Sequence, residues 1–194
     1  MTVSVDGADA LSGGFADPPI DAARAFRACL DVMARPGRIA ELGGAVPPAP
    51  LSVAAGTLAL TLLDGTTPVH LAGAHDTAAV REWITFHIGA PFAGAAEAAF
   101  AFGTWDALTP VDRFAIGTPE YPDRACTLIV ECNALEPRGA RLSGPGIKDE
   151  AFLSLPEVAP FRANRALFPL GFDAFLTAGT RIAGLPRSTI VEDV

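Results

Sequence analysis

The sequence predicts one α/β domain built as a three-layer α/β/α sandwich around a mixed sheet. Helix-type and strand-type patterns alternate along most of the chain, and two strand patterns follow each other directly near the end. The alternation favours parallel strands covered by helices, and the closing pair favours antiparallel addition to the same sheet. The length of 194 residues suits one domain with a sizeable core.

The first predicted helix runs from Asp21 to Arg35. Its apolar residues Phe26, Cys29 or Leu30, and Met33 recur at three- and four-residue spacing, which predicts that they face the core. Pro36-Gly37 ends the helix, because proline cannot continue it and glycine releases the turn.

Two further helices are predicted in the first half of the chain. Leu51 to Leu63 is apolar on nearly every side, which indicates a buried central helix that stops at Asp64-Gly65. Thr77 is the predicted N-cap of a helix through His87, with Val80 and Ile84 facing inward.

The predicted strands are short apolar runs bounded by turn residues. The clearest is Cys126–Cys132, whose β-branched centre is typical of a buried strand. Broken or short helical stretches are predicted at 104–116, around Pro110, and at 157–166. Other strands are predicted at 38–42, 68–71, 98–102, 140–143, 172–177 and 182–187.

Residues 1–18 are small, polar and glycine-rich, so they predict a flexible N-terminal segment before a single domain of residues 19–194. Asp6 and Asp9 stand where a signal peptide would carry basic residues, which favours a cytoplasmic protein. No apolar run approaches the ~18 residues that a membrane-spanning helix needs, so no membrane association is expected.

Charge and motifs exclude several function classes. The formal net charge of −8 argues against nucleic acid as a partner, because phosphate neutralisation needs an excess of Lys and Arg. The three histidines and three cysteines show no metal-ligand spacing, so neither a metal site nor an iron–sulfur cluster is expected. No G-x-S-x-G elbow and no Walker A loop are present.

The turn that follows the predicted strand at 140–143 is a candidate anion site. Its glycines, Gly144 and Gly146, could leave backbone N–H groups pointing at a phosphate or phosphonate. The side chains nearby in the chain are Arg141, Ser143 and Lys148. The alternative interpretation is a tight turn that merely ends the strand.

Two arginines at element ends are further candidates. Arg35 precedes Pro36-Gly37 and Arg187 follows Pro186, and either guanidinium could grip a phosphonate bidentately. The alternative is a surface or interface ion pair. Asp173 and Arg187 are also candidates for contact with another subunit.

Five blocks of the sequence, in order, resemble the PhnH family of the bacterial carbon–phosphorus lyase system. They are FRACLDVMARPGRI from Phe26, LALTLLDGTTPVHL from Leu58, TFHIGAP from Thr85, ARLSGPGI from Ala140 and FPLGFDAFLTAGTRIAGLPRST from Phe168. The segment from Thr104 to Pro122 departs most from the family pattern.

The resemblance implies a fold like the large domain of pyridoxal-phosphate-dependent transferases, without that cofactor. Lys148 is the single lysine, and it lacks an evident set of phosphate and pyridinium partners. The family pattern also implies a homodimer that works with the PhnG, PhnI and PhnJ subunits. That assembly transfers the ribose triphosphate of ATP onto a phosphonate and displaces adenine. The nucleosidase chemistry is attributed to PhnI and the radical bond cleavage to PhnJ.

The sequence therefore supports a required subunit of this complex that is structural more than catalytic by itself. The alternative is a self-sufficient enzyme that binds a phosphorylated small molecule at the 141–148 turn. A third possibility is a scaffold without a ligand site.

Overall fold

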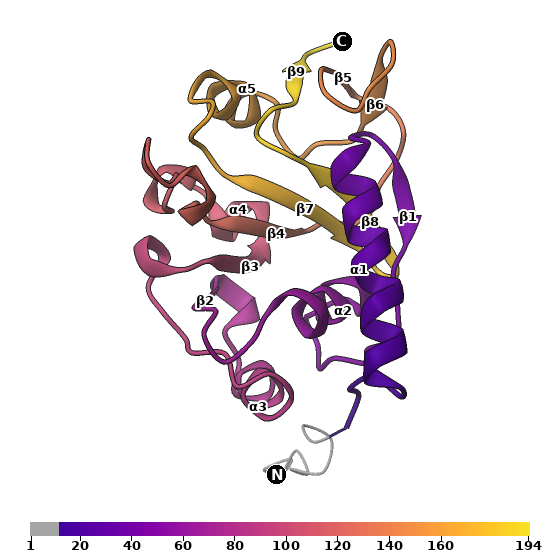
Figure 1. Ribbon diagram of the computed structural model, residues 1–194, viewed down its shortest axis with the longest axis vertical. Helices are drawn as coiled ribbons and strands as arrows, with labels where there is room; N and C mark the ends of the chain where they lie inside the picture. Colours follow the sequence, from indigo (N-terminus) through magenta and orange to yellow (C-terminus); the bar gives the residue numbers. More distant parts are fainter. Residues whose placement is uncertain (1–11) are drawn as a thin grey trace.

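The computed structural model describes residues 12–194 and shows a mixed α/β architecture (Figure 1). Its main sheet has six strands in the order β1-β8-β7-β4-β3-β2. Four of them are parallel neighbours: β2 (Val69–Leu71), β3 (Phe100–Thr104), β4 (Thr127–Glu131) and β7 (Asp173–Ala178). Two antiparallel strands extend the sheet beyond β7: β8 (Arg181–Leu185) and β1 (Ile39–Glu41). The predicted mixed sheet is confirmed.

Three long helices cover one face of this sheet. They are α1 (Pro18–Ala34), α2 (Val53–Leu62) and α3 (Ala78–His87). Their buried side chains form one core cluster with Phe102, Ile129 and Phe175, which lie side by side on β3, β4 and β7. Thr77 caps α3 by accepting from the N–H of Val80 at 3.2 Å, as its sequence pattern predicts.

The buried stripe of α1 differs in part from the predicted one. Cys29, one of the two predicted alternatives, faces the core together with Ala25 and Val32, whereas Phe26 and Leu30 are exposed. The three- and four-residue spacing fits both sets. Small side chains occupy the buried side because α1 lies close to β8. A Cβ at Gly184 of β8 would lie 2.8 Å from the backbone of α1.

The opposite face of the sheet is covered partly by strands, which corrects the prediction of a purely helical third layer. The helices here are short: α4 (Trp105–Leu108) and α5 (Ala159–Ala166). Beside them lies a separate antiparallel sheet in the order β6-β5-β9, made of β6 (Ala151–Leu153), β5 (Ala140–Ser143) and β9 (Ile190–Glu192). Leu142, Leu153 and Val191 of this sheet join the second core cluster. Neither β6 nor β9 is predicted from the sequence, because three-residue strands carry too little alternation to be recognised.

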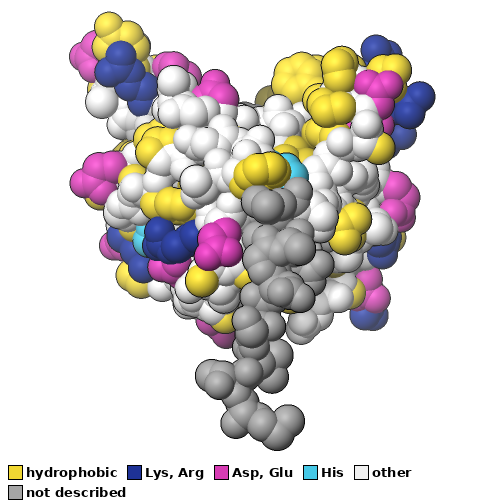
Figure 2. Space-filling model, turned by 90° about the horizontal axis from the view of Figure 1, so that it is seen from below, with side chains coloured by type: hydrophobic (Ala, Val, Ile, Leu, Met, Phe, Trp, Pro, Cys, Tyr) yellow, Lys and Arg dark blue, Asp and Glu magenta, His cyan; other side chains and the backbone are white. Residues whose placement is uncertain are grey.

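The start of the described chain contacts α3. Residues 1–11, with Asp6 and Asp9, lie outside the described part, so the predicted flexible segment is described only from Ser12 onward. The Ser12 carbonyl accepts from Trp83 Nε1 at 3.1 Å and lies 3.0 Å from His87 Nε2. Figure 2 views the molecule from the α3 end, where hydrophobic side chains are scattered on the visible surface. Within residues 12–194, no helix combines the length and the hydrophobicity needed to cross a bilayer.

Candidate functional site

The predicted anion turn after β5 packs against the C-terminal end of α1. The N–H of Ile147 donates to the carbonyl of Gly144 at 3.1 Å, which closes a tight turn. Gly146 has φ +83° and lies so close to the last turn of α1 that a Cβ there would overlap the carbonyl oxygen of Ala34. Close packing and a left-handed backbone therefore account for glycine at 146. The C-terminal end of a helix carries partial negative charge, which disfavours an anion beside it.

The two candidate arginines near this turn, Arg35 and Arg141, are paired with carboxylates. Arg35 pairs with Asp31 one turn earlier on α1. Arg141 lies on the exposed side of β5, 2.9 Å from Glu192 of β9 and 3.9 Å from Glu150. Lys148 is exposed, and Ser143 pairs with Ile190 in the small sheet. The structure thus brings Arg35 and the turn to the same end of α1, but the two arginines are paired with acidic residues.

Asp173 and Arg187 form a largely buried ion pair. Arg187 Nη2 lies 2.6 Å from Asp173 Oδ2, and its Nε donates to Oδ1 at 3.1 Å. The backbone N–H of Arg187 also donates to Oδ1, at 2.8 Å. Only 12% of the Arg187 side chain and 23% of the Asp173 side chain are exposed.

This pair has a third partner in a distant loop. Arg187 Nη1 donates to the carbonyl of Pro122 at 2.7 Å. All three guanidinium nitrogens thus have acceptors within the protein. The pair connects the start of β7, the segment after β8 and the loop before β4. It therefore stabilises the arrangement of these three segments.

A functional candidate that the sequence analysis did not single out is Glu131, at the carboxyl end of β4. Its Oε1 accepts from the N–H of Ser52, the N-cap of α2, at 2.7 Å. Its Oε2 accepts from the hydroxyl of Thr177 on β7 at 2.9 Å. Burial raises the pKa of this carboxyl above its ordinary value, and the hydrogen bonds from Ser52 and Thr177 act in the opposite direction. The sequence feature that could have indicated Glu131 is a single carboxylate at the end of an otherwise apolar strand.

Glu131 borders an open cleft of ≈ 390 Å³ at the carboxyl ends of β3 and β4. Other lining residues include Thr104, Asp106, Cys132 and Asn133. Ligands of open α/β sheets commonly bind at this edge. No arginine, lysine or histidine is among the lining residues, so the cleft offers hydrogen-bond acceptors but no cation for a phosphonate. Burial, followed by the charge of Glu131, raises the pKa of the Cys132 thiol to about 11, which keeps it protonated at neutral pH.

The histidines do not converge on a metal. His70 Nδ1 lies 3.2 Å from the carbonyl of Ala93. His75 is buried without a hydrogen-bond partner for either ring nitrogen, and burial lowers its pKa, which favours the neutral ring. His87 Nε2 lies 3.0 Å from the carbonyl of Ser12. Residues 12–194 contain no group of three or more His, Cys, Asp or Glu side chains arranged to hold a metal ion.

Fold and site together define a mixed α/β protein whose candidate arginines, Arg35, Arg141 and Arg187, pair with carboxylates, with one acidic cleft at the carboxyl edge of the sheet. Comparison with known proteins then identifies the family. The model of the bacterial phosphonate metabolism protein PhnH matches residues 13–192. The chain belongs to the PhnH family.

Two curated relatives extend this result. A Rhizobium meliloti (strain 1021) protein named alpha-D-ribose 1-methylphosphonate 5-triphosphate synthase subunit PhnH is 46% identical over 190 residues, covering 93% of this chain and 95% of the relative. A Stutzerimonas stutzeri protein named putative C-P lyase subunit protein HtxG is 27% identical over 175 residues, covering 85% of this chain and 83% of the relative.

Proposed function

We propose that this protein is a subunit of a ribose 1-phosphonate 5-triphosphate synthase in the carbon–phosphorus lyase pathway, and that it acts only with PhnG, PhnI and PhnJ. The observation that carries the proposal is the extent of the likeness to the Rhizobium meliloti synthase subunit, 46% identity over 190 residues. The internal pairing of Arg35, Arg141 and Arg187 supports a structural role more than a phosphonate site on this chain alone.

Reconstitution tests this function directly. The full chain is co-expressed with PhnG, PhnI and PhnJ, and adenine release from ATP plus methylphosphonate is measured for the purified complex and for each omission. We expect release from the complete complex, loss when this chain is omitted, and none from this chain alone. Undiminished release without this chain, or failure to co-purify with the other subunits, would contradict the proposal.

The self-sufficient alternative makes the opposite prediction. It requires the isolated chain to release adenine and requires Arg141→Ala to abolish that activity. In the proposed function, the same substitution removes only exposed ion pairs with Glu192 and Glu150, so activity of the complex is retained.

We further propose a cytoplasmic homodimer without pyridoxal phosphate, metal or iron–sulfur cluster on this chain. Exposure of Lys148 on a surface turn supports the part concerning pyridoxal phosphate, because a Schiff-base lysine needs an enclosed cofactor site. Phe26 and Leu30, four residues apart on the outer side of α1, support a second copy as partner. Sedimentation of the Phe26→Ser/Leu30→Ser variant tests the dimer, which should dissociate to monomers.

A further inference from the structure

An apolar cavity of ≈ 310 Å³ opens between α5 and the segment that precedes β4. Its lining is largely hydrophobic, from Val111, Phe114, Ile116, Ala163, Leu167 and Phe172. The volume could admit a large apolar side chain, because ligand pockets start at about 300 Å³. We call this the α5 cavity. It lies on the face of the sheet opposite α1 and separate from the acidic cleft that Glu131 borders.

One rim of the α5 cavity presents exposed hydrophobic side chains on a fixed backbone. Leu167 and Phe168 are exposed, the latter at 51%, although both follow directly after α5. The buried amide of Asn164 accepts from the N–H of Phe172 at 2.9 Å and donates to its carbonyl at 2.8 Å. The N–H of Gly171 donates to the carbonyl of Ile116 at 3.0 Å, which joins the two sides of the cavity. Side chains presented on such a constrained loop lose little entropy on binding.

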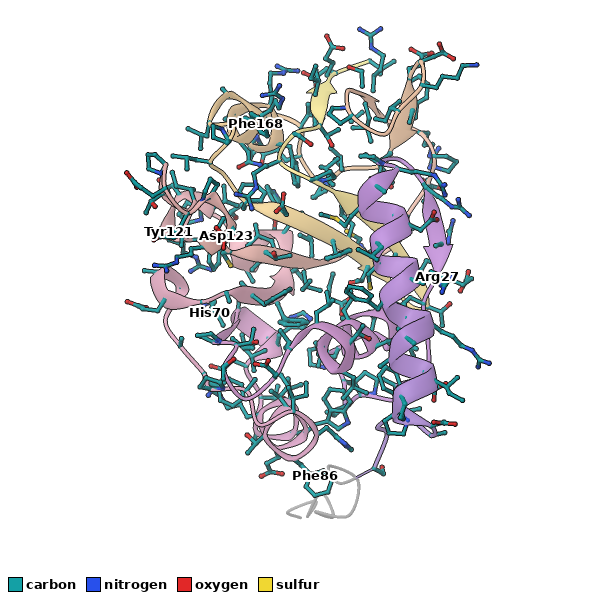
Figure 3. All side chains as sticks on the ribbon, viewed as in Figure 1. Arg27, His70, Phe86, Tyr121, Asp123 and Phe168 are labelled. Carbon is teal, nitrogen blue, oxygen red and sulfur yellow. The ribbon has the colours of Figure 1, made fainter. Side chains whose placement is uncertain are left out.

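The loop at Pro122 lies next to the cavity-lining residue Ile116, which forms a bridge with Ala125, and the Asp173–Arg187 pair fixes this loop. Arg187 Nη1 holds the carbonyl of Pro122, the residue next to exposed Tyr121. Figure 3 shows Tyr121, Asp123 and Phe168 on one side of the molecule, away from α1 and its Arg27. The Asp173–Arg187 pair therefore also positions the loop that carries Tyr121, in addition to stabilising the fold.

Three arginines around the α5 cavity lie over aromatic rings and lack carboxylate partners. The guanidinium carbons of Arg113, Arg124 and Arg165 lie 5.0, 4.0 and 5.0 Å from the ring centroids of Phe114, Tyr121 and Phe168. Among the ion pairs of residues 12–194, none includes these three arginines. Nε of Arg165 is buried without an acceptor. Stacking on a ring holds each planar guanidinium in place, and N–H groups remain able to meet a carboxylate. Arg113 uses Nη2 to donate to the carbonyl of Ala107 at 2.6 Å, which fixes it further.

We propose that this surface docks a different protein subunit, through a segment that inserts an apolar side chain into the α5 cavity and sets carboxylates against Arg113, Arg124 and Arg165. Rigid aromatic anchors and arginines are the side chains that dominate protein interfaces. A second copy of this chain fits less well. In a two-fold contact the same surface of both copies meets, so the arginines of one copy would face those of the other. Asp112 lines the α5 cavity, and Asp123 lies near Tyr121 on the same side of the molecule (Figure 3). These two negative charges favour a partner with individually placed carboxylates over a uniformly acidic one. The inference rests on the proposed function in requiring partner subunits, and it adds the surface and its chemistry.

The test uses the full chain co-expressed with tagged PhnG, PhnI and PhnJ, and measures its dissociation constant from the assembled partners. Phe168→Ser and Arg124→Glu are the test variants. Phe86→Ser and Arg24→Glu are matched controls. Phe86 is 58% exposed at the far end of the molecule (Figure 3), and Arg24 is exposed on α1, away from Phe26 and Leu30 around the helix. Circular dichroism and thermal unfolding of each isolated variant confirm that it is folded.

We expect each test variant to weaken association at least ~10-fold, as loss of an interface hot spot does, and each control to change it less than about twofold. Arg124→Glu should also flatten the dependence of affinity on salt. Wild-type binding with unchanged binding by both folded test variants would overturn the docking surface and leave the proposed function standing. Absence of wild-type binding would overturn both. If Phe168→Ser alters only self-association in sedimentation, the surface is a contact between copies and the proposal is wrong.

Discussion

Breaking the Asp173–Arg187 pair should cost this protein a large part of its stability. The substitution Arg187→Met keeps the length of the side chain but removes the guanidinium, which leaves Asp173 charged and partly buried and the carbonyl of Pro122 without its donor. Removal of one partner of a buried pair costs roughly 3–5 kcal/mol. Because 12% and 23% of the two side chains are exposed, we place the loss near the lower limit, at ~3 kcal/mol.

The assay is urea unfolding at neutral pH, followed by circular dichroism, with Arg187→Met, Asp173→Asn and the double variant forming a thermodynamic cycle. A loss of this size corresponds to a decrease in melting temperature of roughly 6–12 °C for a domain of this length. The matched control is Arg162→Met, which breaks an ion pair with side chains 52% and 70% exposed and should change stability by less than ~0.5 kcal/mol.

Local mobility provides a second measurement. Tryptic cleavage after Arg124 should accelerate in Arg187→Met under native conditions, because the neighbouring Pro122 loses its contact with Arg187. The reasoning is refuted if Arg187→Met costs less than ~1 kcal/mol and the cycle shows no coupling between the two side chains. It is also refuted if Arg162→Met is equally destabilising.

Three more predictions concern other parts of the molecule. Burial raises the pKa of Glu131 in the folded protein. Between the unfolded and the folded pKa values, the Glu131 carboxyl is therefore more protonated in the folded protein than in the unfolded chain. The contribution of Glu131 to stability consequently falls as the pH rises through that window. In urea unfolding from pH 4 to 8, the free energy of unfolding of the isosteric Glu131→Gln variant should therefore rise relative to that of the wild type as the pH increases. A difference in free energy that stays constant with pH would contradict this. Gly146→Ala should destabilise by more than ~2 kcal/mol, from backbone strain plus overlap with Ala34, whereas Gly179→Ala, also at positive φ but with open space around it, should cost only ~1 kcal/mol in the same assay. Native thiols should react slowly with a disulfide reagent at pH 7, because burial raises the pKa values of Cys29 and Cys126 to about 12 and that of Cys132 to about 11; rapid labelling of folded protein would argue against this burial.

Local patterns predicted much of the fold. Thr77 before an amphipathic run, the uniformly apolar segment that became α2, and the β-branched centre of β4 each identify an element whose type follows from neighbouring residues. The antiparallel β7–β8 pair was likewise predicted from two apolar runs around a glycine turn. The predicted inner side of α1 was wrong for Phe26 and Leu30, because the period allows two stripes and only packing against β8 selects between them.

The candidate site was less predictable, because it depends on contacts between distant residues. The sequence placed Arg35 and Arg187 at element ends and Arg141 near the candidate anion turn, but which carboxylate each meets depends on the tertiary fold. Glu131 was missed for the same reason: Ser52 and Thr177 are 79 and 46 residues away along the chain.

By itself, the sequence determined the α/β class, most helices and strands, and membership of the PhnH family, since periodicity, caps and ordered blocks are properties of neighbouring residues. Only the tertiary structure decided that a small antiparallel sheet shares the third layer, that Asp173 and Arg187 hold the loop at Pro122, and that an apolar cavity opens beside three unpaired arginines. The physical reason is that burial and pairing depend on which remote side chains the folded backbone brings within a few ångströms, and local propensity does not contain that information.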